Sequence, residues 1–150
     1  MQSTISQYGA AAIAGLLDGV GPRNVRSYSA EGAVGLARPV ALGTDPAGQC
    51  KNATSGASAV GFAIHDQARE QNSAGLVQYG DKETVSVLTQ GRFWAKTSDA
   101  VVAGAVANMT VADGTLTDAA VAAGIEAFTQ MDVVFITATT GAGLAIVEVK

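Results

Sequence analysis

The chain is poor in side chains that carry chemistry, with one cysteine, Cys50, and one histidine, His65, among its 150 residues. A single cysteine excludes an intrachain disulfide and a zinc site built from paired cysteines. The spacing between Cys50 and His65 matches no usual pair of metal ligands. The sequence therefore predicts neither a metal site nor a bound cofactor.

Charge is also scarce and evenly spread along the chain. Charged residues make up 15% of the sequence, the formal net charge is −4, and no two acidic residues are adjacent. Nucleic-acid binding favours clustered Lys and Arg, so no nucleic-acid partner is expected. The N-terminus lacks the Lys or Arg of a signal peptide. The apolar stretch 10–17 is well short of the roughly 20 residues that span a membrane. We therefore expect no membrane partner and synthesis in a cytoplasm.

Small residues and glycine dominate what remains. The chain is 48% hydrophobic but only 5% aromatic, and it contains 18 glycines. Short apolar segments alternate with turns rich in Gly, Asp, Asn and Ser, which is typical of an all-β protein. We predict a small β-barrel or sandwich, Greek-key or jelly-roll-like, over residues 38–150. The expected strands are 38–43, 59–65, 83–97, 104–111, 122–128, 131–137 and 143–150. Asp113-Gly114 is a strong hairpin signal.

Residues 1–37 show no sustained strand periodicity. "AAAIAGLL" at 10–17 could form a short helix, and the rest is expected to be extended or irregular. Two interpretations stay open: a weakly ordered terminus, or an N-terminal arm that becomes ordered on a partner. In the second, Arg23 and Arg26 are candidate interface residues.

The strand expected at 83–97 contains the only tryptophan, Trp94. Strict alternation places Trp94 on the polar face of that strand, together with Leu88 and Arg92. Either a loop of the same chain covers Trp94, or it lies in an interface, where Trp and Arg are enriched. A bulge at Gly91 would change the alternation, but it would also turn cationic side chains inward, so we disfavour it. In the apolar strand 131–137, Val133 and Phe135 can fill a core. Val134 and Ile136 then lie on the opposite face, where something else must cover them.

The sequence offers no convincing catalytic group. His65 lies beside Asp66, but no serine in a nucleophile-elbow motif accompanies them. "DGTLTD" at 113–118 lacks the further ligands of a calcium loop. The polar segment 65–75 is expected to be an exposed loop or a single helical turn. We predict that the protein is not an enzyme.

The stretch "TVSVLTQGRFWAKTSDAVVAGAVANMTVADGTLT" at 84–117 resembles the structural cement, or decoration, proteins of tailed-bacteriophage capsids. Segments 60–63, 85–94, 102–106, 113–117 and 133–149 match the family's loose structural motifs, so the resemblance covers most of 38–150. Ala105 departs from the pattern, which often has an acidic residue there. Residues 1–37 match nothing specific.

The resemblance implies a protein made in the host bacterial cytoplasm that binds the outer surface of an icosahedral phage head. It would bridge major capsid subunits and stabilise the shell, acting as a homo-oligomer, either a trimer or a dimer. The alternative from the residues is a virion β-sandwich module that binds a receptor or a carbohydrate. In that case Trp94 would be a sugar-stacking platform.

Overall fold

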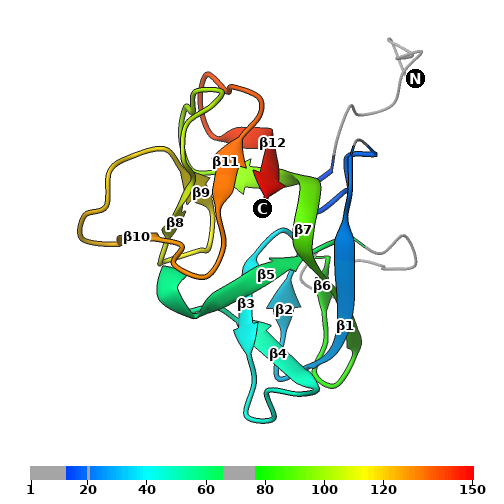
Figure 1. The fold of residues 1–150 in the computed structure, drawn as a ribbon. Coiled ribbons are helices and arrows are strands. Elements are labelled where there is room, and N and C mark those ends of the chain that lie inside the picture. Colours follow the sequence, from blue (N-terminus) through cyan, green and yellow to red (C-terminus); the bar gives the residue numbers. More distant parts are fainter. Residues whose placement is uncertain (1–12, 20, 66–76) are drawn as a thin grey trace, which may run out of the picture.

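A computed structural model describes residues 13–19, 21–65 and 77–150, which are built almost entirely from β-strands (Figure 1). The expected all-β class is confirmed: the described ranges contain one 3-10 turn, η1 (Gly56–Ser58), and no α-helix. The expected loop at 65–75 lies outside the described residues except for His65. Figure 1 shows β8 to β12 in the upper half, most of the earlier strands in the lower half, and β7 linking the two.

The lower half is a closed ring of strands. Its members are β1 (Asn24–Ala30), β4 (Gln49–Asn52), β3 (Pro39–Leu42), β5 (Ala59–Ala63) and the first part of β7 (Thr84–Thr97). They are hydrogen-bonded in that order, and β1 also pairs with β7, so the sheet has no free edge there and forms a small barrel. A two-stranded sheet, β2 (Val34–Gly35) with β6 (Gln78–Tyr79), accompanies it. The hydrophobic core of this lower half contains Val34, Val40, Cys50, Tyr79, Val85 and Val87.

The upper half is assembled on the second part of β7. There β7 pairs antiparallel with β12 (Gly143–Val149), which pairs with β11 (Val133–Phe135). On the other side of β7 the sheet continues, in order of pairing, with β9 (Leu116–Thr117), β8 (Asn108–Thr110) and β10 (Ile125–Ala127). The predicted Asp113-Gly114 turn joins β8 to β9, and Gly114 has a φ of 72°. The core here contains Phe62, Phe93, Leu116, Phe135 and Val147.

Two strands, β1 and β2, lie before residue 38, in the segment where the sequence showed no sustained strand periodicity and an extended or irregular chain was expected. β1 pairs with β7 over residues 84–90, and Ala30 and Val34 are buried in the core. Strands β4 and β6 were not anticipated either, and the segment 104–107 of the expected strand 104–111 is not a strand. Local pattern could not reveal β1, because most of its residues are exposed in this chain and its regularity comes from distant partners.

Strand β7 contains a bulge. Asn24 is paired with Gln90 and Val25 with Leu88, so Thr89 has no partner across the ladder. Val87 before the bulge and Phe93 after it are both buried, so Arg92 and Trp94 keep the outward positions that strict alternation predicts. The expectation that Leu88 lies outward with them is wrong. Leu88 is 0% exposed, because Val87 packs in one core cluster and Leu88 in the other, so both faces of this part of β7 are covered.

The described part of the expected helix at 10–17 is not helical. Gly15 and Leu16 are hydrogen-bonded to the backbone of Trp94, and the Asp18 N–H donates to the Arg92 carbonyl at 3.0 Å. The chain then passes over Gly91, where an added Cβ would lie 3.0 Å from the Arg23 Cβ. Gly91 has a φ of 132°, so both its conformation and this crossing favour glycine.

Candidate docking face

The outward face of the β7–β12–β11 sheet brings together four of the residues singled out in the sequence. Arg92 is paired with Glu148, which is paired with Val134. In the next row, Trp94 is paired with Ile146, whose carbonyl accepts the Ile136 N–H at 2.8 Å. Residues opposite one another in a ladder share a face. We call this surface the docking face, formed by Arg92, Trp94, Val134, Ile136, Ile146 and Glu148.

Burial differs sharply between the two sides of this sheet. The intervening residues Phe93, Val147 and Phe135 are 0% exposed. Every residue of the docking face is instead half-buried. Trp94 is thus partly covered by its own chain and partly open to solvent, and the backbone of residues 15–18 lies along its strand.

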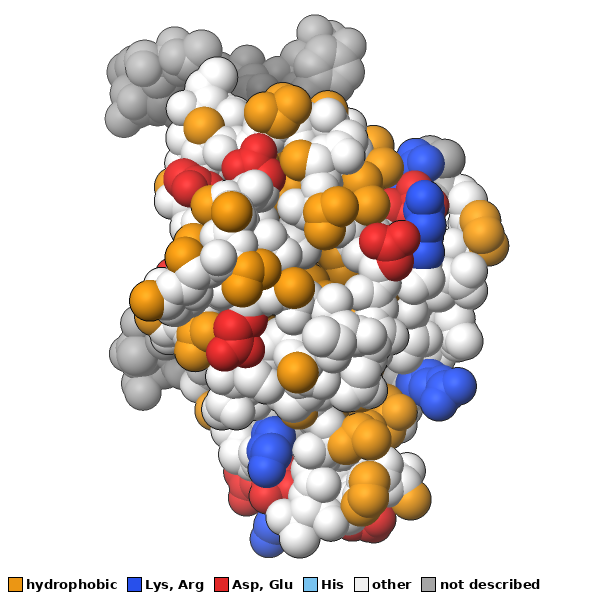
Figure 2. Space-filling view, turned by 60° about the vertical axis from the view of Figure 1, so that its left-hand side comes forward, with side chains coloured by type: hydrophobic (Ala, Val, Ile, Leu, Met, Phe, Trp, Pro, Cys, Tyr) orange, Lys and Arg blue, Asp and Glu red, His pale blue; other side chains and the backbone are white. Residues whose placement is uncertain are grey.

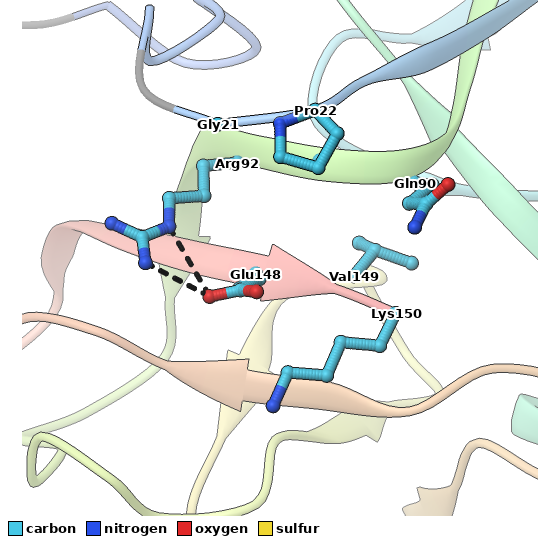
Figure 3. Close-up of a pocket in the computed structure, with 8 residues that line it drawn as sticks. Gly21, Pro22, Gln90, Arg92, Glu148, Val149 and Lys150 are labelled. Atoms are coloured by element: carbon cyan, nitrogen blue, oxygen red, sulfur yellow. Dashed lines mark hydrogen bonds and ion pairs between the residues drawn. The ribbon is translucent and has the colours of Figure 1, made fainter.

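A single ion pair interrupts the apolar character of the docking face. Arg92 Nη2 lies 3.1 Å from Glu148 Oε2, and Arg92 Nε donates to the same oxygen at 3.2 Å. Both side chains are about one-third exposed or less, at 32% and 26%. Arg92 and Glu148 line a cavity of about 80 Å³ together with Pro22 and Lys150. Figure 3 shows the ion pair among these residues. The cavity is too small for a drug-sized ligand.

Exposed valines extend the apolar surface. Val106 forms an isolated bridge with Val134 and is 60% exposed, and Val102 is 65% exposed. Figure 2 shows apolar side chains gathered over the centre of the upper half, with few basic side chains among them. Exposed apolar groups that adjoin one another are typical of protein interaction surfaces. Val106 falls in the expected strand 104–111, but nothing in the sequence indicated that this segment would lie beside Val134.

The remaining residues singled out in the sequence lie elsewhere. Arg23 is exposed where the chain crosses β7 at Gly91, close in sequence to Pro22 beside the Arg92 ion pair. Arg26 is exposed on β1, opposite Val87 and outside the docking face. Leu88 has no exposed surface, so the protomer offers it to no partner.

The groups considered for catalysis or metal binding do not converge. His65 donates its backbone N–H to Gly15, and its side-chain Nδ1 is buried without a hydrogen-bond partner. Asp66 lies outside the described residues. Cys50 is enclosed in the barrel core, and burial raises the pKa of its thiol to about 11. Within residues 13–19, 21–65 and 77–150, no group of three His, Cys, Asp or Glu side chains could hold a metal ion. No helix in those ranges is long and apolar enough to cross a membrane.

Comparisons with known proteins identify the family. A family model described as structural cement protein (E217 gp24/Pam3 gp6) matches residues 1–150. A chain in a solved structure of the capsid of Myoviridae phage XM1 has the same fold, with a TM-score of 0.73. That match covers 99% of this chain and 96% of the other at 19% identity, a likeness that concerns the fold alone. No curated protein matches the chain. A family of structural proteins also favours the expectation that the chain is not an enzyme. This chain therefore belongs to the structural cement protein family of phage capsids, and its role is that of a capsid cement protein.

Proposed function

We propose that this cement protein binds the outer surface of the phage head through the docking face and bridges neighbouring major capsid subunits. The observation that carries the proposal is the convergence of Trp94, Ile136 and Ile146 on one half-exposed sheet face whose opposite side is core. A rigid three-stranded platform holds these side chains in a fixed array. Such preorganisation lowers the entropy cost of docking.

The chemistry of the face favours apolar contacts over ion pairs. Its one charged pair, Arg92 with Glu148, is already satisfied within the protomer. Binding should therefore survive moderate salt, because screening weakens contacts between separate charges more than apolar burial. Many copies on one particle multiply a modest energy at each site, and simultaneous contact with several subunits adds avidity.

The segment before β1 also contributes to this proposal. Ile13, at the start of the described part, is 44% exposed, and the residues that follow it are bonded to the backbone of Trp94. The described chain therefore begins beside the strand that carries Trp94. We propose that residues 1–12 add contacts to the shell, so a protein without them should decorate shells more weakly. Self-association as a dimer or trimer stays a prediction, which sedimentation equilibrium can check.

The test is the disruption temperature of DNA-filled particles with and without the protein, at low and at high salt. A ligand that binds only the assembled shell stabilises it by mass action, so the temperature should rise in both conditions. Equal temperatures, together with loss of host attachment in its absence, would overturn the proposal. That result would favour the receptor- or carbohydrate-binding module instead.

A further inference from the structure

A second cavity, of about 300 Å³, lies where the barrel meets the upper half of the molecule. One wall is the turn from Gly35 to Arg38, and the other is the Asp113–Thr115 turn of the β8–β9 hairpin. Lys96 of β7 lines it as well. The docking-face residues do not line this cavity, and nothing in the docking argument uses it.

Two glycines in the wall of this cavity leave the space that the Arg38 side chain occupies. A Cβ at Gly35 would lie 2.7 Å from Arg38 Cδ, and a Cβ at Gly114 would lie 2.9 Å from Arg38 Nε and 3.3 Å from Nη2. A side chain at either glycine would therefore require the Arg38 side chain to shift. Ala37, directly before Arg38, has a left-handed φ of 59°, which a non-glycine residue adopts only where its surroundings enforce it.

The Nε atom of Arg38 nevertheless lacks a hydrogen-bond partner. This atom is buried, and no ion pair of Arg38 occurs among the described residues. A buried donor with no acceptor is costly and rare in native proteins.

The acidic group in the cavity does not supply that acceptor. Asp113 Oδ1 accepts the Thr115 N–H at 3.0 Å and the Thr115 hydroxyl at 2.7 Å, which close the turn. Partial burial acts to raise the pKa of Asp113, but these hydrogen bonds and the charge of Arg38 outweigh it, so the pKa is lowered. Arg38 and Lys96 thus bring two positive charges to a cavity that is also lined by the single carboxylate of Asp113.

We infer that this cavity is an acceptor site for a carboxylate, supplied by an acidic side chain of a capsid subunit, which Arg38 binds and Lys96 assists. Arginine pairs with carboxylates through parallel N–H donors. Because Nε is buried, Nη1 and Nη2 are the donors that would meet the incoming carboxylate. Lys96 lies two residues beyond Trp94 on the outward side of β7, so the site adjoins the docking face. The inference rests on the proposed function, and it adds a polar anchor that fixes the orientation of the apolar contact.

The experiment measures co-sedimentation of the full-length protein with purified shells that lack it. Arg38→Gln removes the charge and the fork, and it should weaken binding at least about tenfold. Arg38→Lys, which keeps only the charge, should rescue part of that loss. Lys96→Gln should weaken binding about threefold. Lys51→Gln is the matched control: it also removes one positive charge from an exposed strand position, away from the cavity, and should leave binding unchanged.

The source of the acceptor is tested on the shell. Amidation of shell carboxylates with a carbodiimide and glycinamide should reduce wild-type binding to the level of Arg38→Gln, without a comparable further loss for that variant. Binding is compared per folded molecule, and Lys96→Gln gives a second measurement if Arg38→Gln folds poorly. Competition by inorganic phosphate but not by acetate at equal ionic strength, with amidation having no effect, would assign the site to phosphate and overturn the inference. Equal binding of wild type and Arg38→Gln would overturn the carboxylate site but leave the cement role intact. Failure of the wild type to bind shells would overturn the proposed function itself.

Discussion

Leu88→Ala and Trp94→Ala form a matched pair on one strand, and the structure predicts opposite consequences for them. Leu88 is 0% exposed and belongs to the cluster with Phe62 and Phe93, with β1 and β5 paired on either side of it. Truncating such a leucine removes buried methyl groups and leaves a cavity, which costs about 3 kcal/mol of unfolding free energy. For a chain of this size that lowers the melting temperature by roughly 6–12 °C. Shell binding per folded molecule should not change.

Trp94→Ala should show the reverse pattern. Trp94 is half-buried on the docking face, so its removal should lower the unfolding free energy less than Leu88→Ala does. Buried aromatic anchors at interfaces commonly contribute about 2 kcal/mol or more, and shell affinity should therefore fall about thirtyfold. The loss arises because the tryptophan would be fully desolvated only in the complex.

The two variants are compared by urea denaturation and by co-sedimentation with shells, with affinity corrected for the folded fraction. The reasoning fails if Leu88→Ala weakens shell binding per folded molecule while Trp94→Ala leaves it normal. It also fails if Trp94→Ala destabilises the free protein as much as Leu88→Ala, because that would place the tryptophan in the core.

Three further results are expected from the geometry of single sites. Gly91→Ala should destabilise the protein by about 1–3 kcal/mol, because φ of 132° is strained for alanine and the new Cβ would meet Arg23; an unchanged urea midpoint would contradict this. Cys50 should resist a thiol reagent at about pH 8 in the folded protein and react once urea unfolds it, since its pKa is raised to about 11 and the side chain is buried; rapid labelling of the native state would show that the barrel opens. The folded pKa of Asp113 lies below its ordinary value of 3.8, so its stabilisation is present above that pH and is lost as the pH falls through the folded pKa. Asp113→Asn should therefore lose less stability than the wild type on acidification, as measured by urea midpoints between about pH 3 and pH 6.

The all-β class could be predicted from the sequence because it depends on local pattern. Alternating apolar residues and turn residues marked β3, β5, β7, β11 and β12, and the Asp113-Gly114 dipeptide marked the β8–β9 turn. Each of these signals lies within a few residues of the element that it defines. The low content of cysteine, histidine and clustered charge, and the resemblance at 84–117, pointed to a structural capsid protein rather than to an enzyme.

Tertiary structure alone decided which faces these strands present and which distant segments they join. Residues 24–30 have no strand signal of their own, yet they close the barrel because β7 and β4 supply their backbone partners. Leu88 is buried because distant strands pair with β7 on either side of it and core clusters cover both faces of the strand there. Trp94 meets Ile146, and Arg38 meets Gly114, across separations that no local periodicity encodes. Register and long-range pairing follow from the packing of the whole chain, and they determine the docking face and the cavity beside it.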